Sequence, residues 1–229
     1  MKRNLFCILL LTSAVVLSAT AQQSAPAIDR PSEPNFVFDD DGGAVQIVPP
    51  DFAVAGEKKF HGGAVMTSAR QVSIFLGAGW GDQQIRPRQT VLIDVAASNG
   101  GAPVAEMQKH SIKTLRASPR LEDFGDLSKV RVNDLTIQQK LSDLLQSKAL
   151  PAPTASTVYV IYLAPEIVST LGAHKAGVDY LAYHNFVNLE AGEVHYVVVP
   201  FNHNADHHSH AAARAFAEAA LSPNGKGWY

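Results

Sequence analysis

Three apolar stretches along the chain have the pattern of buried β-strands. Residues 71–77 alternate between apolar and other side chains, whereas residues 157–163 and 193–201 are apolar with few interruptions. Strands that are apolar on both faces are typical of a sheet that other elements cover on both sides. The pattern therefore predicts three central strands of one sheet.

Two segments between these strands have helical spacing of their apolar side chains. Residues 137–145 carry an apolar stripe with Asn133 or Asp134 at the N-cap position, and a proline-rich stretch at 150–153 follows. This arrangement predicts a helix that ends before the prolines. Residues 88–98 fit a helix face, but their β-branched content also fits a strand. We favour the helix.

The other connecting segments have weaker patterns. Residues 100–134 are polar and irregular, so we expect a loop with one strand near 112–115. A short helix is expected over residues 165–171. Strands that alternate with helices indicate an α/β fold in a single domain, with a central, mostly parallel or mixed sheet and helices on both of its faces.

Residues 195–229 combine a strand, a histidine-rich loop, an alanine-rich helix and a Pro/Gly turn at 222–225 that ends the helix. At about 100° per residue, one stripe of the helix is polar, and the opposite face is narrow and apolar and suits close packing on a sheet. The polar stripe comprises His207, His210, Arg214 and Glu218. The apolar face comprises Ala212, Phe216, Ala219 and Ala220.

Residues 1–21 have the composition of a secretory signal peptide. Lys2 and Arg3 precede an apolar core at 5–17, and a small-x-small cleavage site ends the segment. We therefore expect a secreted or periplasmic protein. The apolar run is too short to span a membrane, so no integral membrane segment is expected after cleavage. Cys7 is the only cysteine, so the mature chain has no disulfide and no thiolate ligand.

The segment at 22–56 is rich in proline and contains an acidic run at 39–41. This composition is typical of a linker, and we expect it to be poorly ordered. The ordered α/β domain is expected to comprise residues 57–229. The net charge of −2 gives no argument for nucleic acid or an anionic membrane as a partner.

The C-terminal helix has part of a zinc-hydrolase motif. A metallopeptidase of the zincin type carries His-Glu-x-x-His or His-Glu-x-x-Glu on a helix, with metal ligands at i and i+4 and a base at i+1. Here Glu218 occupies the second ligand position, but Arg214 and Ala215 replace the first ligand and the base. Arginine stays protonated and cannot bind a metal, and it can pair with a glutamate four residues later. The motif is therefore incomplete.

Histidines before and within this helix offer a different metal site. His203, His207 and His210 follow one another at spacings of four and three residues, which suits two or three imidazoles on one ion, with Glu218 as a further ligand. Histidine clusters in exported proteins are also found exposed, where they bind metal only adventitiously. Our first expectation is that the protein has no cofactor, and Zn²⁺ is the alternative.

The order of four short stretches is similar to that of a known family. They are Phe-His-Gly-Gly at 60–63 with Gly-Ala-Gly-Trp at 77–80, Leu-Pro at 150–151 ahead of Val-Tyr-Val-Ile at 158–161, Ala-Tyr-His at 182–184, and a closing segment at 217–229 that ends in Gly-Trp-Tyr. Through these motifs, residues 58–229 resemble the phosphate-induced protein 1 / EXORDIUM family of secreted proteins, in a bacterial-looking version.

This resemblance implies an extracellular protein linked to growth or cell-surface signalling, without an agreed catalytic activity. The chain lacks the cysteines of the family, and it carries Arg214 and Ala215 where some bacterial relatives have a His-Glu-x-x-Glu-like helix. His61 and His184 match the two signature histidines. They are expected either to line a polar pocket at strand ends, with Arg214 and Glu218 as further pocket candidates, or to hydrogen-bond loop carbonyls and fix turns.

Two functions of different class follow from these patterns. The first is an EXORDIUM-like secreted protein that acts at the cell envelope or outside the cell by binding an unidentified ligand or by signalling, without catalysis. The second is a metal-dependent, zincin-like hydrolase that uses the histidine cluster and Glu218. Arg214 and Ala215 favour the first function, because they remove a metal ligand and the base.

Overall fold

The computed structural model describes residues 58–93, 102–115 and 130–228, together with the strands at 35–38, 44–47 and 122–124. All of these belong to one compact unit, Ser32–Tyr229. The predicted signal peptide, most of the predicted linker, residues 94–98 of the predicted helix 88–98, and Tyr229 lie outside the described residues.

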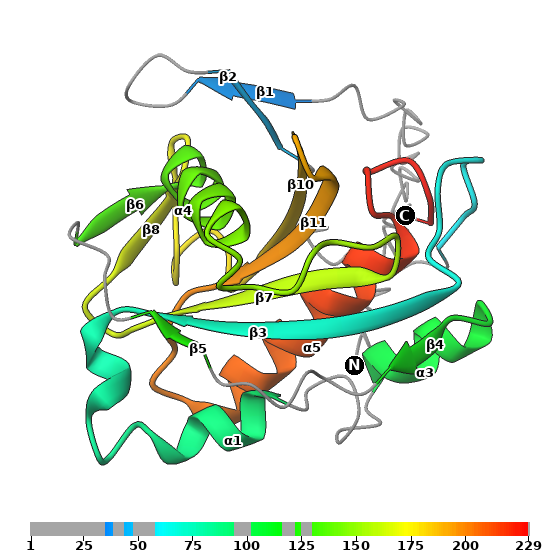
Figure 1. Ribbon diagram of the computed structural model, residues 1–229. Coiled ribbons are helices and arrows are strands. Elements are labelled where there is room, and N and C mark those ends of the chain that lie inside the picture. The colour runs from blue at the N-terminus through cyan, green and yellow to red at the C-terminus, as the bar shows by residue number, and fades with distance from the viewer. Residues whose placement is uncertain are drawn as a thin grey trace, which may run out of the picture. The chain divides into compact units, whose positions relative to one another are not determined.

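A six-stranded sheet forms the centre of the domain (Figure 1). Its strands are β3 (Ser68–Leu76), β4 (Lys113–Leu115), β5 (Glu122–Phe124), β7 (Thr157–Leu163), β10 (Tyr183–Leu189) and β11 (Gly192–Val199). The strand order is β10-β11-β7-β3-β4, and β5 pairs with the last part of β3. All pairs are parallel except β10 with β11. The predicted mostly parallel, mixed sheet is confirmed, and its three predicted central strands are neighbours.

Helices pack on both faces of this sheet, as predicted (Figure 1). They are α1 (Pro87–Ile93), α3 (Ala102–Lys109), α4 (Asp134–Gln146) and α5 (Ala205–Leu221). Helix α4 lies on one face, and α5 lies on the opposite face with α1 and α3 packed against it. Successive side chains of a strand point to opposite faces, so Tyr196 of β11 points toward α4 while its neighbour Val197 points toward α5.

The structure confirms the predicted ends of the two long helices. The Asn133 side chain caps α4 by accepting a hydrogen bond from the Thr136 amide at 2.9 Å. Helix α5 ends at Leu221 with Ser222 as its C-cap, and Gly225 in the following turn has a φ of 73°, which glycine adopts without strain. The predicted apolar face of α5 is buried, and Ala213 and Ala217 outside it are buried as well, because α3 packs on α5 from another side.

The expected helix at 165–171 is wrong. Instead, β8 (Val168–Leu171) forms a second sheet with β6 (Arg131–Asn133) and β9 (His174–Lys175). The β-branched side chains of Val168 and Thr170 favour a strand once a partner strand is present. That partner, β6, lies far back in the sequence, and its pairing was not apparent from local periodicity.

The segment at 100–134 contains more structure than the expected loop with one strand. The strand near 112–115 is confirmed as β4, but α3 and the short strands β5 and β6 lie in the same segment. The helix favoured at 88–98 is confirmed over Pro87–Ile93.

Within the predicted linker, β1 (Asn35–Phe38) and β2 (Ala44–Ile47) form an antiparallel pair that the composition did not indicate. In the described part of the chain, none of the helices has the length and apolar character needed to cross a membrane.

Candidate functional site

The histidine-rich loop and the start of α5 follow the carboxyl end of β11, as the sequence predicted. Asn204 is the N-cap, and its side chain accepts hydrogen bonds from the amides of Asp206 at 3.0 Å and His207 at 3.1 Å. The side chains of His203, His207 and His210 are exposed. The helix cap is therefore made by an asparagine, and these three histidines extend into solvent.

The polar stripe of α5 is spread along the helix and is not gathered at one point. With a rise of about 1.5 Å per residue, Glu218 lies about 16 Å along the axis from His207 and about 12 Å from His210. Zinc ligands lie about 2 Å from their metal. Within the described ranges, no group of three His, Cys, Asp or Glu side chains is close enough to hold a metal ion. The structure therefore does not assemble the expected metal site of His203, His207, His210 and Glu218.

The predicted pairing of Arg214 with Glu218 is confirmed. Nε of Arg214 donates to Oε1 of Glu218 at 2.8 Å, across one turn of α5. The two side chains are 38% and 11% exposed, so the pair lies at the border of the packed core. A guanidinium thus binds the one carboxylate that the incomplete zincin motif retains.

His61 and His184 each contact the segment that follows α5. The His61 side chain is exposed, and its backbone amide donates to the carbonyl of Gly227 at 3.0 Å. The His184 ring is buried on β10, with Nε2 3.2 Å from the carbonyl oxygen of Ser222 in the turn after α5. The alternative interpretation, in which the ring fixes a turn by contacting a loop carbonyl, is therefore confirmed for His184.

The loop after β3 is packed tightly against the end of β7. Gly77 has a φ of 112°, and a Cβ there would lie 2.5 Å from the Cβ of Ala164, so the position requires glycine. A 3₁₀ turn at Ala78–Gly81 then buries Trp80, whose Nε1 donates to the carbonyl of Tyr162 at 3.1 Å. These contacts hold the carboxyl edge of the sheet, where α/β proteins usually bind their ligands.

Arg88 of α1 contacts the loop that follows β11, at the same carboxyl edge of the sheet. Its guanidinium donates to the backbone carbonyls of Asn202 and His203, both at 2.6 Å. Its Cζ lies 4.9 Å from the ring centroid of Phe201, in the geometry of a cation–π contact. Arg88 therefore ties α1 to the loop between β11 and α5.

Within the histidine-rich stretch at 203–210, the structure buries His208, which the predicted metal site did not include. His208 is 1% exposed and packs among the rings of Trp80, Tyr162 and Phe201. Neither ring nitrogen has a hydrogen-bond partner among the described residues. Burial first, and the nearby charge of Arg88 second, lower the pKa of His208 to about 4. The ring is therefore neutral at neutral pH.

A buried carboxylate lies on the opposite face of the sheet. Asp134, the first residue of α4, is 3% exposed. Its Oδ1 accepts from the hydroxyl of Tyr183 at 2.7 Å. Its Oδ2 accepts from the hydroxyl of Tyr196 at 2.8 Å, from Nε2 of Gln138 at 2.8 Å and from Nδ2 of Asn185 at 3.0 Å. Burial raises the pKa of Asp134 more than the four hydrogen bonds lower it. All donors are satisfied, so this network fixes α4 on the sheet.

The sequence pattern indicated Asp134 only as a possible helix cap. The two tyrosines that bind it follow 49 and 62 residues later in the chain, and only the fold brings them to it. An aspartate at the start of a helix is common, because it interacts favourably with the helix dipole. No local signal in the sequence distinguishes this buried aspartate from an exposed one.

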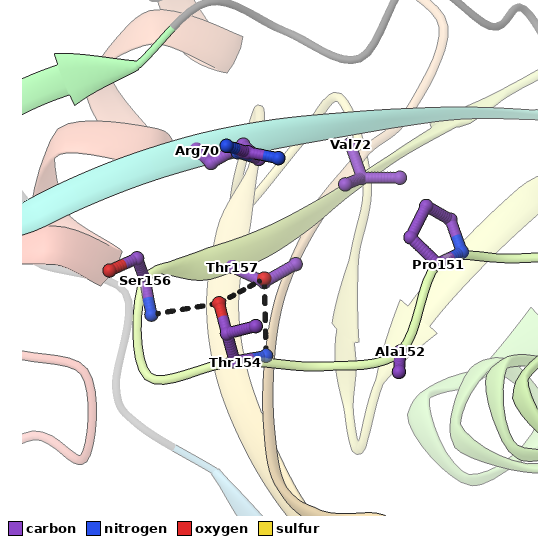
Figure 2. Close-up of a pocket in the computed structure, with 7 residues that line it drawn as sticks. All are labelled: Arg70, Val72, Pro151, Ala152, Thr154, Ser156 and Thr157. Carbon is purple, nitrogen blue, oxygen red and sulfur yellow. Dashed lines mark hydrogen bonds between the residues drawn. The ribbon is translucent and has the colours of Figure 1, made fainter.

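A pocket of about 240 Å³ lies at the amino ends of β3 and β7 (Figure 2). Strand β3 contributes Arg70 and Val72, which are register partners of Thr157 and Tyr159. The other lining residues belong to the chain that enters β7. They are Pro151, Ala152, Thr154, Ser156 and Thr157. The sequence pattern did not indicate this pocket, because hydroxyl and proline residues before a strand are typical of an ordinary loop.

Comparison of the chain with family models and with curated proteins finds no match in either set.

Proposed function

We propose that the protein is an exported, EXORDIUM-like binding protein that acts at the cell envelope or outside the cell, without catalytic activity of its own. The observation that carries this proposal is the ion pair of Arg214 with Glu218 at 2.8 Å. A zincin-like hydrolase needs the carboxylate at this position for its metal. Here that carboxylate is neutralised by a side chain that remains protonated at any physiological pH.

Two further observations support a binding role. Asp134 accepts four hydrogen bonds from protein side chains and is 3% exposed, so it is not placed to exchange protons with a substrate. The basic and apolar segments at residues 1–21 support export, and the four family-like motifs support an extracellular role.

The experiment that tests this proposal measures zinc in protein purified without a His-tag. We expect no stoichiometric zinc by elemental analysis. Zinc that dialysis removes, and that is absent from a His207→Ala/His210→Ala variant, would be adventitious binding to exposed histidines. One tightly held zinc per chain that is lost in Glu218→Ala would overturn the proposal and favour the hydrolase.

Export is tested separately by the intact mass of the protein recovered outside the cytoplasm. We expect cleavage after Ala21, which yields a chain that begins at Gln22 and contains no thiol. A recovered protein that retains Cys7 would contradict the export part of the proposal.

A further inference from the structure

The pocket at the amino ends of β3 and β7 has a cationic wall. Arg70 and Thr157 are register partners on parallel strands, so their side chains lie side by side on the same face of the sheet. Arg70 is exposed, and among the described residues its guanidinium has no hydrogen-bond or ion-pair partner. Lys113 of β4 is the register partner of Ser68 and adds a second exposed cation on this face.

The chain segment that enters β7 supplies hydroxyl groups (Figure 2). Oγ1 of Thr154 lies 2.7 Å from Oγ1 of Thr157, and Oγ of Ser156 lies 2.9 Å from Oγ of Ser68. Each pair has two hydroxyl protons, and its internal hydrogen bond uses only one of them. One hydroxyl proton of the Thr154–Thr157 pair therefore remains for a ligand, whereas the hydroxyl of Ser156 points away from these two groups and bonds Ser68, which does not line the pocket. None of the residues that line the pocket is acidic.

The remaining lining is apolar and the volume is small. Val72, Pro151 and Ala152 contribute carbon surface beside the polar groups. Pocket volumes of about 300–1,000 Å³ are typical of sites for drug-sized molecules, and 240 Å³ lies below that range. The space suits a compact ligand that has a charged head and a short carbon skeleton.

We propose that this pocket binds a small organic anion, with its oxyanion head on the guanidinium of Arg70 and the hydroxyls of Thr154 and Thr157, and its carbon skeleton on Val72 and Pro151. A guanidinium binds carboxylate and phosphate groups through two parallel hydrogen bonds, and this planar fork gives orientation as well as charge. The proposal rests on the binding role proposed above and names its class of ligand. Zinc content and export do not bear on it, so the two proposals fail separately.

The test is an NMR titration of the full-length mature, ¹⁵N-labelled protein with butyrate, with butyramide and with inorganic phosphate at constant ionic strength. Butyramide matches butyrate in size and lacks its charge, whereas phosphate has the charge without the carbon skeleton. We expect saturable shifts of the amides of Arg70, Thr154, Ser156 and Thr157 with butyrate, at a Kd on the order of millimolar. Phosphate is expected to bind several-fold more weakly, and butyramide to produce no saturable shift.

Variants locate the site. Arg70→Gln should weaken butyrate binding at least about tenfold, and Arg70→Lys should weaken it less, because a lysine keeps the charge but loses the fork. Arg131→Gln is the matched control: it removes the same charge from an exposed strand residue of β6, and it should change the affinity by less than about twofold. Both arginines are exposed, so each variant is expected to fold, which its own spectrum verifies.

Three outcomes would overturn the proposal. Equal responses to butyrate and butyramide would show that charge is not recognised. Equal affinities of Arg70→Gln and Arg131→Gln would place any anion elsewhere. Phosphate that binds as tightly as butyrate would remove the organic part of the proposal and leave an inorganic anion as the ligand.

Discussion

Asp134 and His208 are both buried ionisable side chains, and they lie on opposite faces of the same sheet. Asp134 accepts four hydrogen bonds from Tyr183, Tyr196, Gln138 and Asn185. His208 is buried to the same degree, yet neither of its ring nitrogens has a partner among the described residues. A fully satisfied polar network rigidifies a core, whereas an unsatisfied buried group lowers stability.

This difference between Asp134 and His208 shows that polar contacts hold the helix on one face of the sheet and that apolar packing holds the helix on the other face. On the α4 face, one carboxylate holds residues of β10, β11 and α4 in a fixed relation. On the α5 face, aromatic packing around His208 and a dense row of alanines hold the helix, and the imidazole is tolerated in its neutral form. We therefore expect substitutions at the two positions to have effects of very different size.

The largest effect is expected from Asp134→Ala. The substitution leaves two tyrosine hydroxyls and two amide groups without their acceptor in a dry environment. We expect the free energy of unfolding to fall by about 3–5 kcal/mol, measured by urea denaturation. The matched control is Asp143→Ala, an exposed aspartate of the same helix, with an expected change below about 0.5 kcal/mol. Similar losses in the two variants would contradict the structural role of Asp134.

The second prediction concerns the pH dependence of stability, to which His208 and Asp134 contribute with opposite sign. The pKa of His208 is about 4 in the folded protein and near 6.5 when unfolded, so between these values the unfolded chain binds more protons. Stability should fall by about 3 kcal/mol as the pH decreases from about 7 to 4. Asp134 acts in the opposite direction, because its raised pKa makes the folded state take up its proton first.

This pH dependence is checked by urea denaturation at several pH values between 7 and 4. In the variant His208→Leu, the free energy of unfolding should decrease much less over this pH range. A smaller decrease should remain, because burial also lowers the pKa of His195. If wild type and variant show equal slopes with pH, His208 is not the group that destabilises the protein in acid.

An intermediate effect is expected from the ion pair on α5, which is less buried than Asp134. Exposed pairs contribute below about 1 kcal/mol, and breaking a buried pair costs about 3–5 kcal/mol. With Glu218 at 11% and Arg214 at 38% exposure, we expect Glu218→Ala to cost about 2 kcal/mol. Arg214→Ala/Glu218→Ala should recover part of this loss. Strict additivity of the two single variants would show that the side chains do not interact.

The smallest effect is expected from His208→Leu at pH 7. Leucine has a similar volume and removes two unsatisfied nitrogens, so the free energy of unfolding should change by less than about 1 kcal/mol or increase. A loss of more than about 2 kcal/mol in urea denaturation would show that the imidazole has a hydrogen-bond partner, such as a buried water molecule. His208 would then be a satisfied buried polar group, as Asp134 is.

Local pattern was sufficient for the elements that have strong periodicity. The apolar runs of β3, β7 and β11 and the stripes of α4 and α5 predicted buried strands and amphipathic helices, and together these predicted an α/β sheet with helices on both faces. The Arg214–Glu218 pair was predictable for the same reason, since residues four apart on a helix are neighbours whatever the rest of the chain does.

Short elements and long-range pairs were decided by the tertiary structure. Strand β8 forms because β6 lies beside it, and local pattern favoured a helix there. The same holds for the sites. Spacing of three and four residues suggested that the histidines of α5 share a metal with Glu218, but helical rise separates them. The partners of Asp134 and the register that places Arg70 beside Thr157 join residues far apart in the chain. The periodicity of the sequence determines which side chains can be buried. Which of these side chains come into contact depends on strand order and register, and these are set by contacts between segments that are distant in the sequence.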